Sequence, residues 1–314
     1  MSTVRAAVVD PSAAGRLILG EVAAPMPAPH EALVRVAAIS LNRGEVRGAM
    51  DAQAGARPGW DLAGTVAQVA TDGSGPQAGE RVVGFLPSGA WAELVAVPTS
   101  ALAALPAGVS FAQAATLPVA GLTALHAVEK GGPLLGRTVL VGGASGGAGN
   151  FAIQLARASG ASVVAIVRQE RHAAAARAAG ATAIVISEDG AEAVAHGPYD
   201  LIVESVGGRL LGTVLPMLAK GGICVTFGGS AGHEVTIDLR RFFPLGGVRL
   251  YGLILFEEVT RRPASAGLGL LVGLIADGRL TPHIEVEAPW TDIATVAQGL
   301  LDRRYAGKAV LHVG

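Results

Sequence analysis

Apolar and polar residues follow two different rhythms along this chain, and the change of rhythm divides it. In the first hundred residues, short runs of alternating apolar and polar residues are separated by Gly, Pro, Asp and Ser. Such runs predict the β-strands of a barrel or sandwich. The strands expected on this basis lie at 3–9, 32–41, 61–70, 79–85 and 91–98.

From residue 138 onward, wholly apolar strands alternate with helical patterns, which is typical of parallel βαβ units covered by helices on both faces. Strands are expected at 138–142, 162–167, 183–186, 201–205, 223–227 and 248–255, and helices at 147–159, 169–179 and 208–219. Two more helices, at 267–278 and 291–304, precede a strand at 308–313 that could rejoin the first β region. The predicted fold class is therefore α/β, a doubly wound parallel sheet with a second, β-rich domain.

Composition excludes several classes of function and of binding site. A net charge of −1 carries no electrostatic footprint for nucleic acid. The single cysteine, Cys224, excludes an internal disulfide and a cysteine-cluster metal site, and it suits a reducing compartment such as the cytoplasm. Residues 94–128 lack charged side chains, but Pro98, Pro106 and Pro118 break the run. We expect no membrane span there, and the first residues do not resemble a signal peptide.

A glycine-rich bend follows the first strand of the parallel region, in "VLVGGASGGAGNFAIQLA" at 139–156. It contains Ala144-x-Gly146-x-x-Gly149, one residue short of the dinucleotide-binding fingerprint, between a strand and a helix. Gly146 would let a pyrophosphate approach, Gly149 would let the helix pack on its strand, and the helix N-terminus would attract the phosphates. The same stretch fits the G-x-S-x-G elbow of a hydrolase at Ser145, as does a second stretch at Ser230. A hydrolase would need an acid and a histidine, such as Asp277 with His283 or Asp302 with His312; the bend could also be a turn without a ligand.

The second parallel strand indicates which dinucleotide is bound. NAD sites carry an acidic residue at the tip of this strand, whereas here the strand ends in Val167-Arg168. Arg168 and Arg171, with His172 beside them, could pair with a 2′-phosphate, which favours NADP. Arg168 could also be only an exposed charge at a strand end.

The chain as a whole resembles the medium-chain dehydrogenase/reductase superfamily, in its zinc-free quinone oxidoreductase (zeta-crystallin-like) branch. The resemblance rests on the glycine bend and on a series of further motifs in the same order and spacing. These motifs are "SLNRGEV" (40–46), "PGWDLAGTV" (58–66), "AGERVVGF" (78–85), "ATLPVAGLTALHAV" (115–128), "DLIVESVGG" (200–208), "LAKGGICVTFGG" (218–229) and "GKAVLHV" (307–313).

The resemblance implies a GroES-like catalytic domain at 1–114 and 256–314, a Rossmann domain at 115–255, and an active site in the cleft between them. Zinc-dependent members would place their metal ligands at Asn42, Trp60 and near Val119, and these residues cannot form a tetrahedral zinc site. The tyrosine donor of related enoyl reductases is also missing between Asn42 and Pro58. The family further implies a homodimer joined through the strand at 248–255.

The resemblance also assigns site residues. Asn42 would be the catalytic residue, facing the nicotinamide and the acceptor, and Trp60 would line the substrate pocket unless it is only core packing. Arg43 would approach the cofactor phosphates unless it pairs with Glu45 or Glu80. Further cofactor contacts are expected from Thr123, Ser145, Gly146, Gly147, Ala148, Arg168, Arg171, Ser205, Val206, Gly207, Phe227, Gly228, Leu253 and Leu255.

The expected reaction is NADPH-dependent reduction of a small electron acceptor, a quinone or an activated C=C bond. Such acceptors disperse the developing charge themselves, so the protein mainly orients them and excludes water. A cofactor-binding structural or regulatory protein without turnover is the alternative.

Overall fold

The computed structural model describes residues 2–314, which form two compact units. The β-rich unit contains the chain up to Leu122 together with Val259–Gly278 and Ile284–Gly314, and the parallel-sheet unit contains Thr123–Glu258 and Arg279–His283. The first border therefore falls at Leu122 rather than at residue 114, and the second at Glu258 rather than at residue 255. Residues 279–283 join the parallel-sheet unit because Gln154 exchanges two hydrogen bonds with the backbone of Thr281, at 2.8 Å each.

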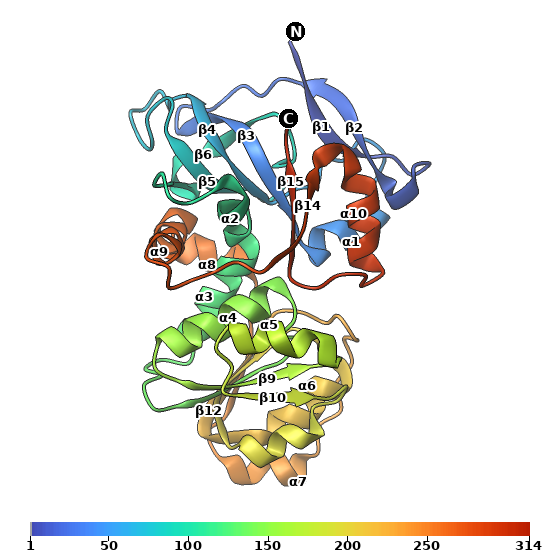
Figure 1. Cartoon of the computed structure of the whole chain (residues 1–314), viewed down its shortest axis with the longest axis vertical. Coiled ribbons are helices and arrows are strands. Elements are labelled where there is room, and N and C mark those ends of the chain that lie inside the picture. The colour runs from blue at the N-terminus through green and yellow to red at the C-terminus, as the bar shows by residue number, and fades with distance from the viewer. Residues whose placement is uncertain (1) are drawn as a thin grey trace. The chain divides into compact units, whose positions relative to one another are not determined.

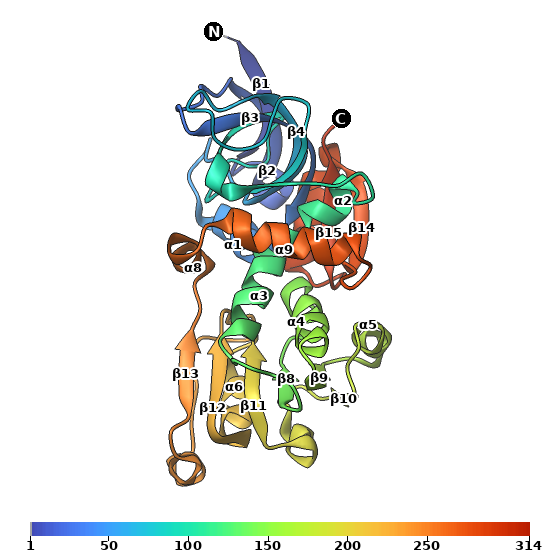
Figure 2. The same ribbon diagram turned by 90° about the vertical axis from the view of Figure 1, so that its left-hand side faces the viewer.

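The parallel-sheet unit is built on six strands in the order β10-β9-β8-β11-β12-β13, with every neighbouring pair parallel (Figure 2). This is the doubly wound order 3-2-1-4-5-6. The strands are β8 (Thr138–Val141), β9 (Ser162–Val167), β10 (Ala183–Ile186), β11 (Tyr199–Glu204), β12 (Leu218–Thr226) and β13 (Arg249–Gly252).

Helices cover both faces of this sheet, as its apolar strands require. Figure 1 shows α4 and α5 over one face and α6 over the other. The helices of this part of the chain are α3 (Leu122–Glu129), α4 (Gly147–Ala158), α5 (Ala173–Ala178), α6 (Gly208–Val214), α7 (Leu239–Phe242) and α8 (Leu255–Arg261). The core between the sheet and α6 is aliphatic and includes Leu140, Ile166, Ile202 and Val214.

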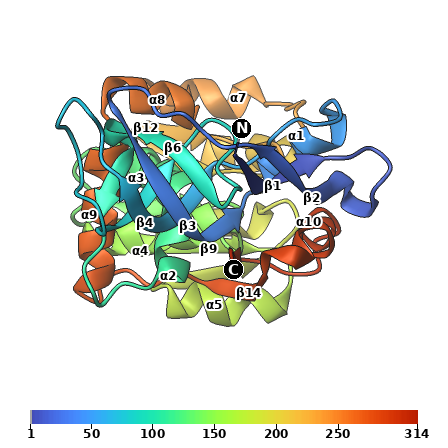
Figure 3. The same cartoon turned by 90° about the horizontal axis from the view of Figure 1, so that it is seen from above.

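The β-rich unit contains a seven-stranded sheet and a separate antiparallel pair, β1 with β2. In the sheet the order is β14-β15-β3-β4-β5-β7, and β6 also pairs with β3; Figure 3 shows β3 beside β4. The strands are β1 (Thr3–Val9), β2 (Leu17–Ala23), β3 (Glu31–Leu41), β4 (Asp61–Gln68), β5 (Arg81–Phe85), β6 (Leu94–Pro98), β7 (Leu102–Ala104), β14 (Ile284–Pro289) and β15 (Lys308–His312). The helices are α1 (Arg43–Asp51), α2 (Phe111–Ala115), α9 (Ala264–Ala276) and α10 (Ile293–Leu301).

The return of the C-terminal strand to the N-terminal β region is confirmed, because β15 pairs antiparallel with β3, Ala309 opposite Leu41. Other expectations need correction. The helix expected over 208–219 ends at Val214, because Pro216 lies in a short 3-10 turn and β12 begins at Leu218. The strand expected over 248–255 spans only Arg249–Gly252. The elements that were not anticipated are β2, β7, β14, α1, α2, α3, α7 and α8.

The charge-free segment 94–128 is mostly buried connecting structure, as expected. It forms β6, β7, α2, a π-helical turn at Leu117–Gly121 and most of α3. Among residues 2–314 no helix is both long and apolar enough to cross a membrane.

Candidate functional site

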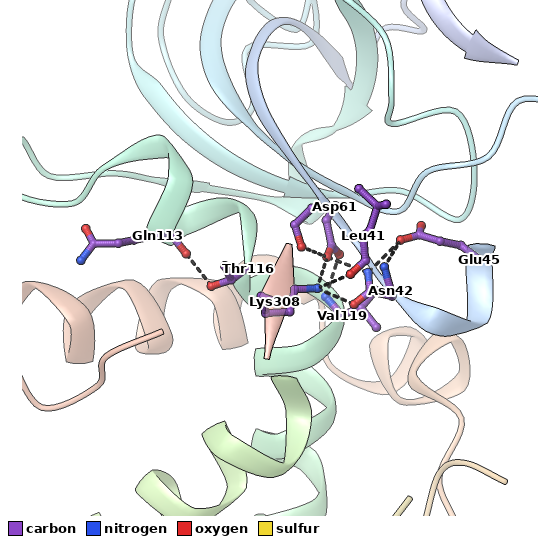
Figure 4. A network of polar contacts seen from close by, with 9 residues as sticks. Leu41, Asn42, Glu45, Asp61, Gln113, Thr116, Val119 and Lys308 are labelled. Atoms are coloured by element: carbon purple, nitrogen blue, oxygen red, sulfur yellow. Dashed lines mark hydrogen bonds and ion pairs between the residues drawn. The ribbon is translucent and has the colours of Figure 1, made fainter. Parts of the chain in front are cut away.

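Two of the three positions compared with zinc ligands, Asn42 and Val119, bond to one buried carboxylate, Asp61 (Figure 4). Asn42 Nδ2 donates to Asp61 Oδ2 at 2.7 Å, and the backbone N–H of Val119 donates to Asp61 Oδ1 at 2.9 Å. Trp60 directly precedes Asp61 in the chain. The structure thus brings the positions together, around a residue that the sequence pattern had not singled out.

The sheet register explains why these groups meet. β3 ends at Leu41, and its residue Ser40 lies opposite Asp61 on β4. Asn42 is extended (φ −121°, ψ 145°) and precedes the first residue of α1. Its backbone N–H donates to Glu45 Oε1 at 2.7 Å, which satisfies one of the amide groups that a helix N-terminus leaves without a partner.

A buried ammonium completes the network. Lys308, the first residue of β15, lies 3.2 Å from Asp61 Oδ2, and Ser40 Oγ donates to the same oxygen at 3.0 Å. Lys308 is 3% exposed and Asp61 is fully buried. Removing two charges from water is costly unless they are paired and hydrogen-bonded, and here both conditions are met. A charged residue at the first position of a largely apolar strand, Asp61 in β4 and Lys308 in β15, was the available signal, and it was missed.

Glu45 is the third ionisable member of this network. Burial raises the pKa of its carboxyl well above the ordinary value, the nearby Asp61 charge raises the pKa further, and Lys308 opposes both. Glu45 Oε1 accepts the Asn42 backbone N–H and also Asn42 Nδ2 at 3.0 Å. Glu45 therefore holds its proton more tightly than an exposed carboxyl does, beside the ion pair of Lys308 and Asp61.

Arg43 and Trp60 lie next to this network. The Arg43 guanidinium donates to the Leu300 carbonyl at the end of α10, at 3.2 Å. Trp60 is half-buried, and its ring packs on Gly44, where an added Cβ would lie 3.0 Å from Cη2. A cofactor contact of Arg43 and a pocket role of Trp60 stay predictions.

The donor set at these positions is an amide, an indole and a backbone N–H, none of which is an ordinary zinc ligand. Within the described residues, no group of three or more His, Cys, Asp or Glu side chains is arranged to hold a metal ion. What the arrangement offers instead is hydrogen bonding around a fixed positive charge.

The glycine bend has the geometry that a dinucleotide needs. α4 begins at Gly147 with Gly146 as its N-cap and no side chain capping it, so the first N–H groups of the helix remain available to an anion. A Cβ at Gly149 would lie 2.3 Å from the Gly143 carbonyl oxygen, so only glycine lets the helix start this close to the strand. Ser145, Gly146, Gly147 and Ala148 are all partly exposed along the bend.

The loops after β11 and β12 lie beside the bend, at the carboxyl edge of the sheet where such folds bind ligands. A Cβ at Gly143 would lie 2.4 Å from Ser205 Oγ, and one at Gly228 would lie 2.6 Å from the Ser205 carbonyl oxygen. Buried Glu204 accepts the backbone N–H groups of Val206 and Gly207 at 2.5 and 3.0 Å. The structure therefore places Ser205 and Val206 beside Gly143 of the bend, and Gly228 beside Ser205. Gly207 and Phe227 adjoin these residues in the chain.

The remaining expected cofactor residues lie as follows. Arg168 is exposed directly after β9, beside the strand that leads into the bend, and Arg171 follows it in a 3-10 turn. Thr123 is buried in α3, and Leu253 and Leu255 are buried after β13. Their contacts with a cofactor stay predictions.

Of the two acid–histidine pairs that a hydrolase could use, the pair Asp302 and His312 is not bonded together, because each residue bonds to other side chains. His312 bonds Glu287 at 2.7 Å, and Asp302 accepts from Gln298 and Arg304. A Ser-His-Asp relay requires the acid to orient the histidine, and nothing of this kind joins Asp302 to His312 in these contacts.

Together, a doubly wound sheet with a glycine bend at its carboxyl edge and a separate β-rich unit are the features of a nucleotide-dependent dehydrogenase or reductase. Comparison with known proteins supports this class of protein. Residues 28–107 match the family model of the alcohol dehydrogenase GroES-like domain, and residues 147–266 match that of the zinc-binding dehydrogenases.

Individual relatives are more specific. A quinone oxidoreductase of Pseudomonas aeruginosa is 30% identical over 302 residues, covering 91% of this chain and 92% of that protein. A mycocerosic acid synthase-like polyketide synthase of Mycobacterium tuberculosis is 29% identical over 302 residues, covering 91% of this chain, and the chain spans only 14% of that synthase's length.

Solved structures agree as well. A mycobacterial quinone oxidoreductase superposes with a TM-score of 0.87 at 26% identity, covering 99% of this chain and all of the other. A mycobacterial structure complexed with NADPH has the same TM-score and identity, covering 98% and 100%. The chain belongs to the medium-chain dehydrogenase/reductase superfamily, in its quinone oxidoreductase branch.

Proposed function

We propose that the protein is an NADPH-dependent reductase that transfers a hydride to a quinone, or to the activated C=C bond of an enone or enal, without zinc. The proposal rests on the residues that stand where zinc-dependent relatives would have their metal ligands. An Asn42 amide stands there within a hydrogen-bonded network, and its Asp61 partner also receives the Val119 backbone N–H.

The bend and its neighbouring loops support NADP as the cofactor. A pyrophosphate would meet the N–H groups at the start of α4, and the exposed Arg168 guanidinium follows the second strand, where an acid would favour NAD. When bound, NADPH supplies a hydride from its nicotinamide ring. The mycobacterial neighbour complexed with NADPH supports this choice.

The protein's own residues then orient the acceptor and favour the charge that develops on its oxygen. The acceptor gains the hydride, with its two electrons, and a proton from water, giving a hydroquinone or a saturated carbonyl compound. Donors that are already positioned at the oxygen lower the barrier most. We assign this role to the Asn42 amide. A simple ketone cannot disperse its charge in this way, so we expect little activity on ketones or simple alcohols.

The experiment measures NADPH or NADH consumption with a panel of quinones, enones and enals, and NADP+ or NAD+ reduction with alcohols, by absorbance before and after chelator treatment. We expect turnover with the first three classes, a preference for NADPH and no effect of the chelator. NADPH binding without turnover on any acceptor would favour the regulatory alternative. Zinc-independent oxidation of a primary alcohol would contradict the reaction class.

Asn42→Ala tests the assignment within the same assay. Losing one hydrogen bond to a developing charge costs about 1.5–3 kcal/mol, so kcat should fall roughly ten-fold or more while NADPH affinity stays nearly constant. Gln298→Ala is the matched control, because it also removes a partly buried amide from the β-rich unit, one that donates to Asp302 at 2.8 Å. Unchanged turnover in Asn42→Ala would remove this residue from the mechanism.

A further inference from the structure

The side chain of Lys308 uses all three of its N–H groups inside the protein. They donate to Asn42 Oδ1 at 2.6 Å, to the Leu41 carbonyl at 3.1 Å and to Asp61 Oδ2 at 3.2 Å (Figure 4). The shortest of these bonds goes to the amide oxygen of Asn42. A buried ammonium with no donor to spare is therefore aimed at one end of that amide.

Asp61 acts on the opposite end. Its Oδ2 accepts from Asn42 Nδ2 at 2.7 Å as well as from Ser40 and Lys308, and its Oδ1 is held by Val119. Rotating the Asn42 amide by half a turn would place its NH2 group against the ammonium and its oxygen against the carboxylate. Both contacts would be repulsive, and buried polar groups without partners are costly, so one orientation is imposed.

The bond from Asn42 to Glu45 is the one that can be given up. It is longer, 3.0 Å against 2.7 Å, and Glu45 Oε1 already accepts the Asn42 backbone N–H. Of the two Asn42 side-chain N–H groups, the one directed at Glu45 can therefore exchange Glu45 Oε1 for another oxygen on the same side, while the amide keeps its orientation.

We propose that Lys308 and Asp61 are positioning residues for Asn42: by holding the amide oxygen on the ammonium and the nitrogen on the carboxylate, they make Asn42 a hydrogen-bond donor toward the substrate's oxygen. This inference rests on the proposed function and extends it to two residues that need not touch substrate. A donor is the group that a developing negative charge requires. Reversal of the amide would present an acceptor to the same charge.

The test compares Lys308→Met/Asp61→Asn with the wild type. The double variant removes both charges, because Lys308→Met alone would leave Asp61 buried without its counter-ion and could fail to fold. Lys130→Met/Glu258→Gln is the control, since it likewise removes both charges of a pair with a buried glutamate, Lys130 with Glu258 at 2.9 Å, in the other unit. Measurements are kcat and KM with a quinone, the NADPH dissociation constant, and NMR of the Asn42 side-chain amide, assigned by its loss in Asn42→Ala.

In the wild type we expect two separate, exchange-protected amide proton signals from Asn42. In the double variant we expect this protection to be lost and kcat to fall roughly ten-fold, with NADPH affinity within about two-fold. A folded double variant with wild-type kcat, or with unchanged Asn42 amide signals, would overturn the positioning role. If the wild type has no turnover but the amide signals respond as expected, the proposed function fails while the orienting role of Lys308 and Asp61 stands.

Discussion

Substitution by alanine should have different effects at two glycines of the bend: it should lower stability at Gly149 and weaken cofactor binding at Gly146. At Gly149 an added Cβ would lie 2.3 Å from the Gly143 carbonyl oxygen and 2.9 Å from Ala144 Cα, about 1 Å inside ordinary contact. Both neighbours are backbone atoms, which cannot rotate away, so α4 must move off its strand. At Gly146 the nearest atom would lie at 3.4 Å, and φ is −80°, which alanine adopts without strain.

The magnitudes follow from these contacts. Overpacking of this kind costs about 1–3 kcal/mol, and the better helix propensity of alanine returns less than about 1 kcal/mol. We expect Gly149→Ala to destabilise the parallel-sheet unit by about 2 kcal/mol, which lowers its midpoint by about 4–8 °C. Gly146→Ala should cost less than about 1 kcal/mol, as an alanine at an N-cap does. Its methyl group would stand where the pyrophosphate approaches, so NADPH binding should weaken about ten-fold or more.

The location of the tryptophans allows the two units to be followed separately. Trp60, Trp91 and Trp290 all belong to the β-rich unit, so their fluorescence reports its unfolding, whereas far-UV circular dichroism also follows the helices of the parallel-sheet unit. In Gly149→Ala the dichroism transition should move to lower temperature more than the fluorescence transition. NADPH titration of both variants completes the measurement. A Gly149→Ala protein as stable as the wild type, or a Gly146→Ala protein with unchanged NADPH affinity, would refute the reasoning.

Further predictions concern pH, cofactor choice, assembly and metal. Folding raises the pKa of Glu45, so the folded state holds the Glu45 proton more tightly than the unfolded state does. The protonated carboxyl therefore stabilises the fold at low pH, and this contribution is lost as pH rises from 4.5 through the folded pKa. Glu45→Gln should remove the resulting fall of Tm with pH. Arg168→Glu should weaken NADPH binding at least ten-fold more than NADH binding in parallel titrations. We propose a homodimer through the sheet edge β13, where Leu250 is 50% and Ile254 60% exposed; light scattering should give twice the chain mass, and Leu250→Asp should reduce it. Elemental analysis should find no stoichiometric zinc.

The parallel-sheet unit and its glycine bend were predictable from the sequence because their signals are local. A strand, a bend and the following helix lie within 139–156, and the steric reason for Gly149 acts between residues six apart. The apolar strands and their alternation with helices are periodic along the chain, so the doubly wound arrangement followed from the pattern. Some ends were misjudged, as at Val214, where Pro216 ends the helix early, and the helices α3, α7 and α8 were not anticipated.

The polar network could not be predicted in this way, because its members are far apart in the chain. Lys308 and Asp61 are separated by 247 residues and meet only because β15 and β4 both pair with β3. From sequence, Asn42 was a residue in place of a zinc ligand; the tertiary structure determined which end of its amide meets a cation and which meets carboxyls. Strand register decides such contacts, and a shift of one residue would turn Asp61 and Lys308 to the opposite face of the sheet. The residue type at position 42 is thus a property of the sequence, whereas its hydrogen-bonding direction is a property of the fold.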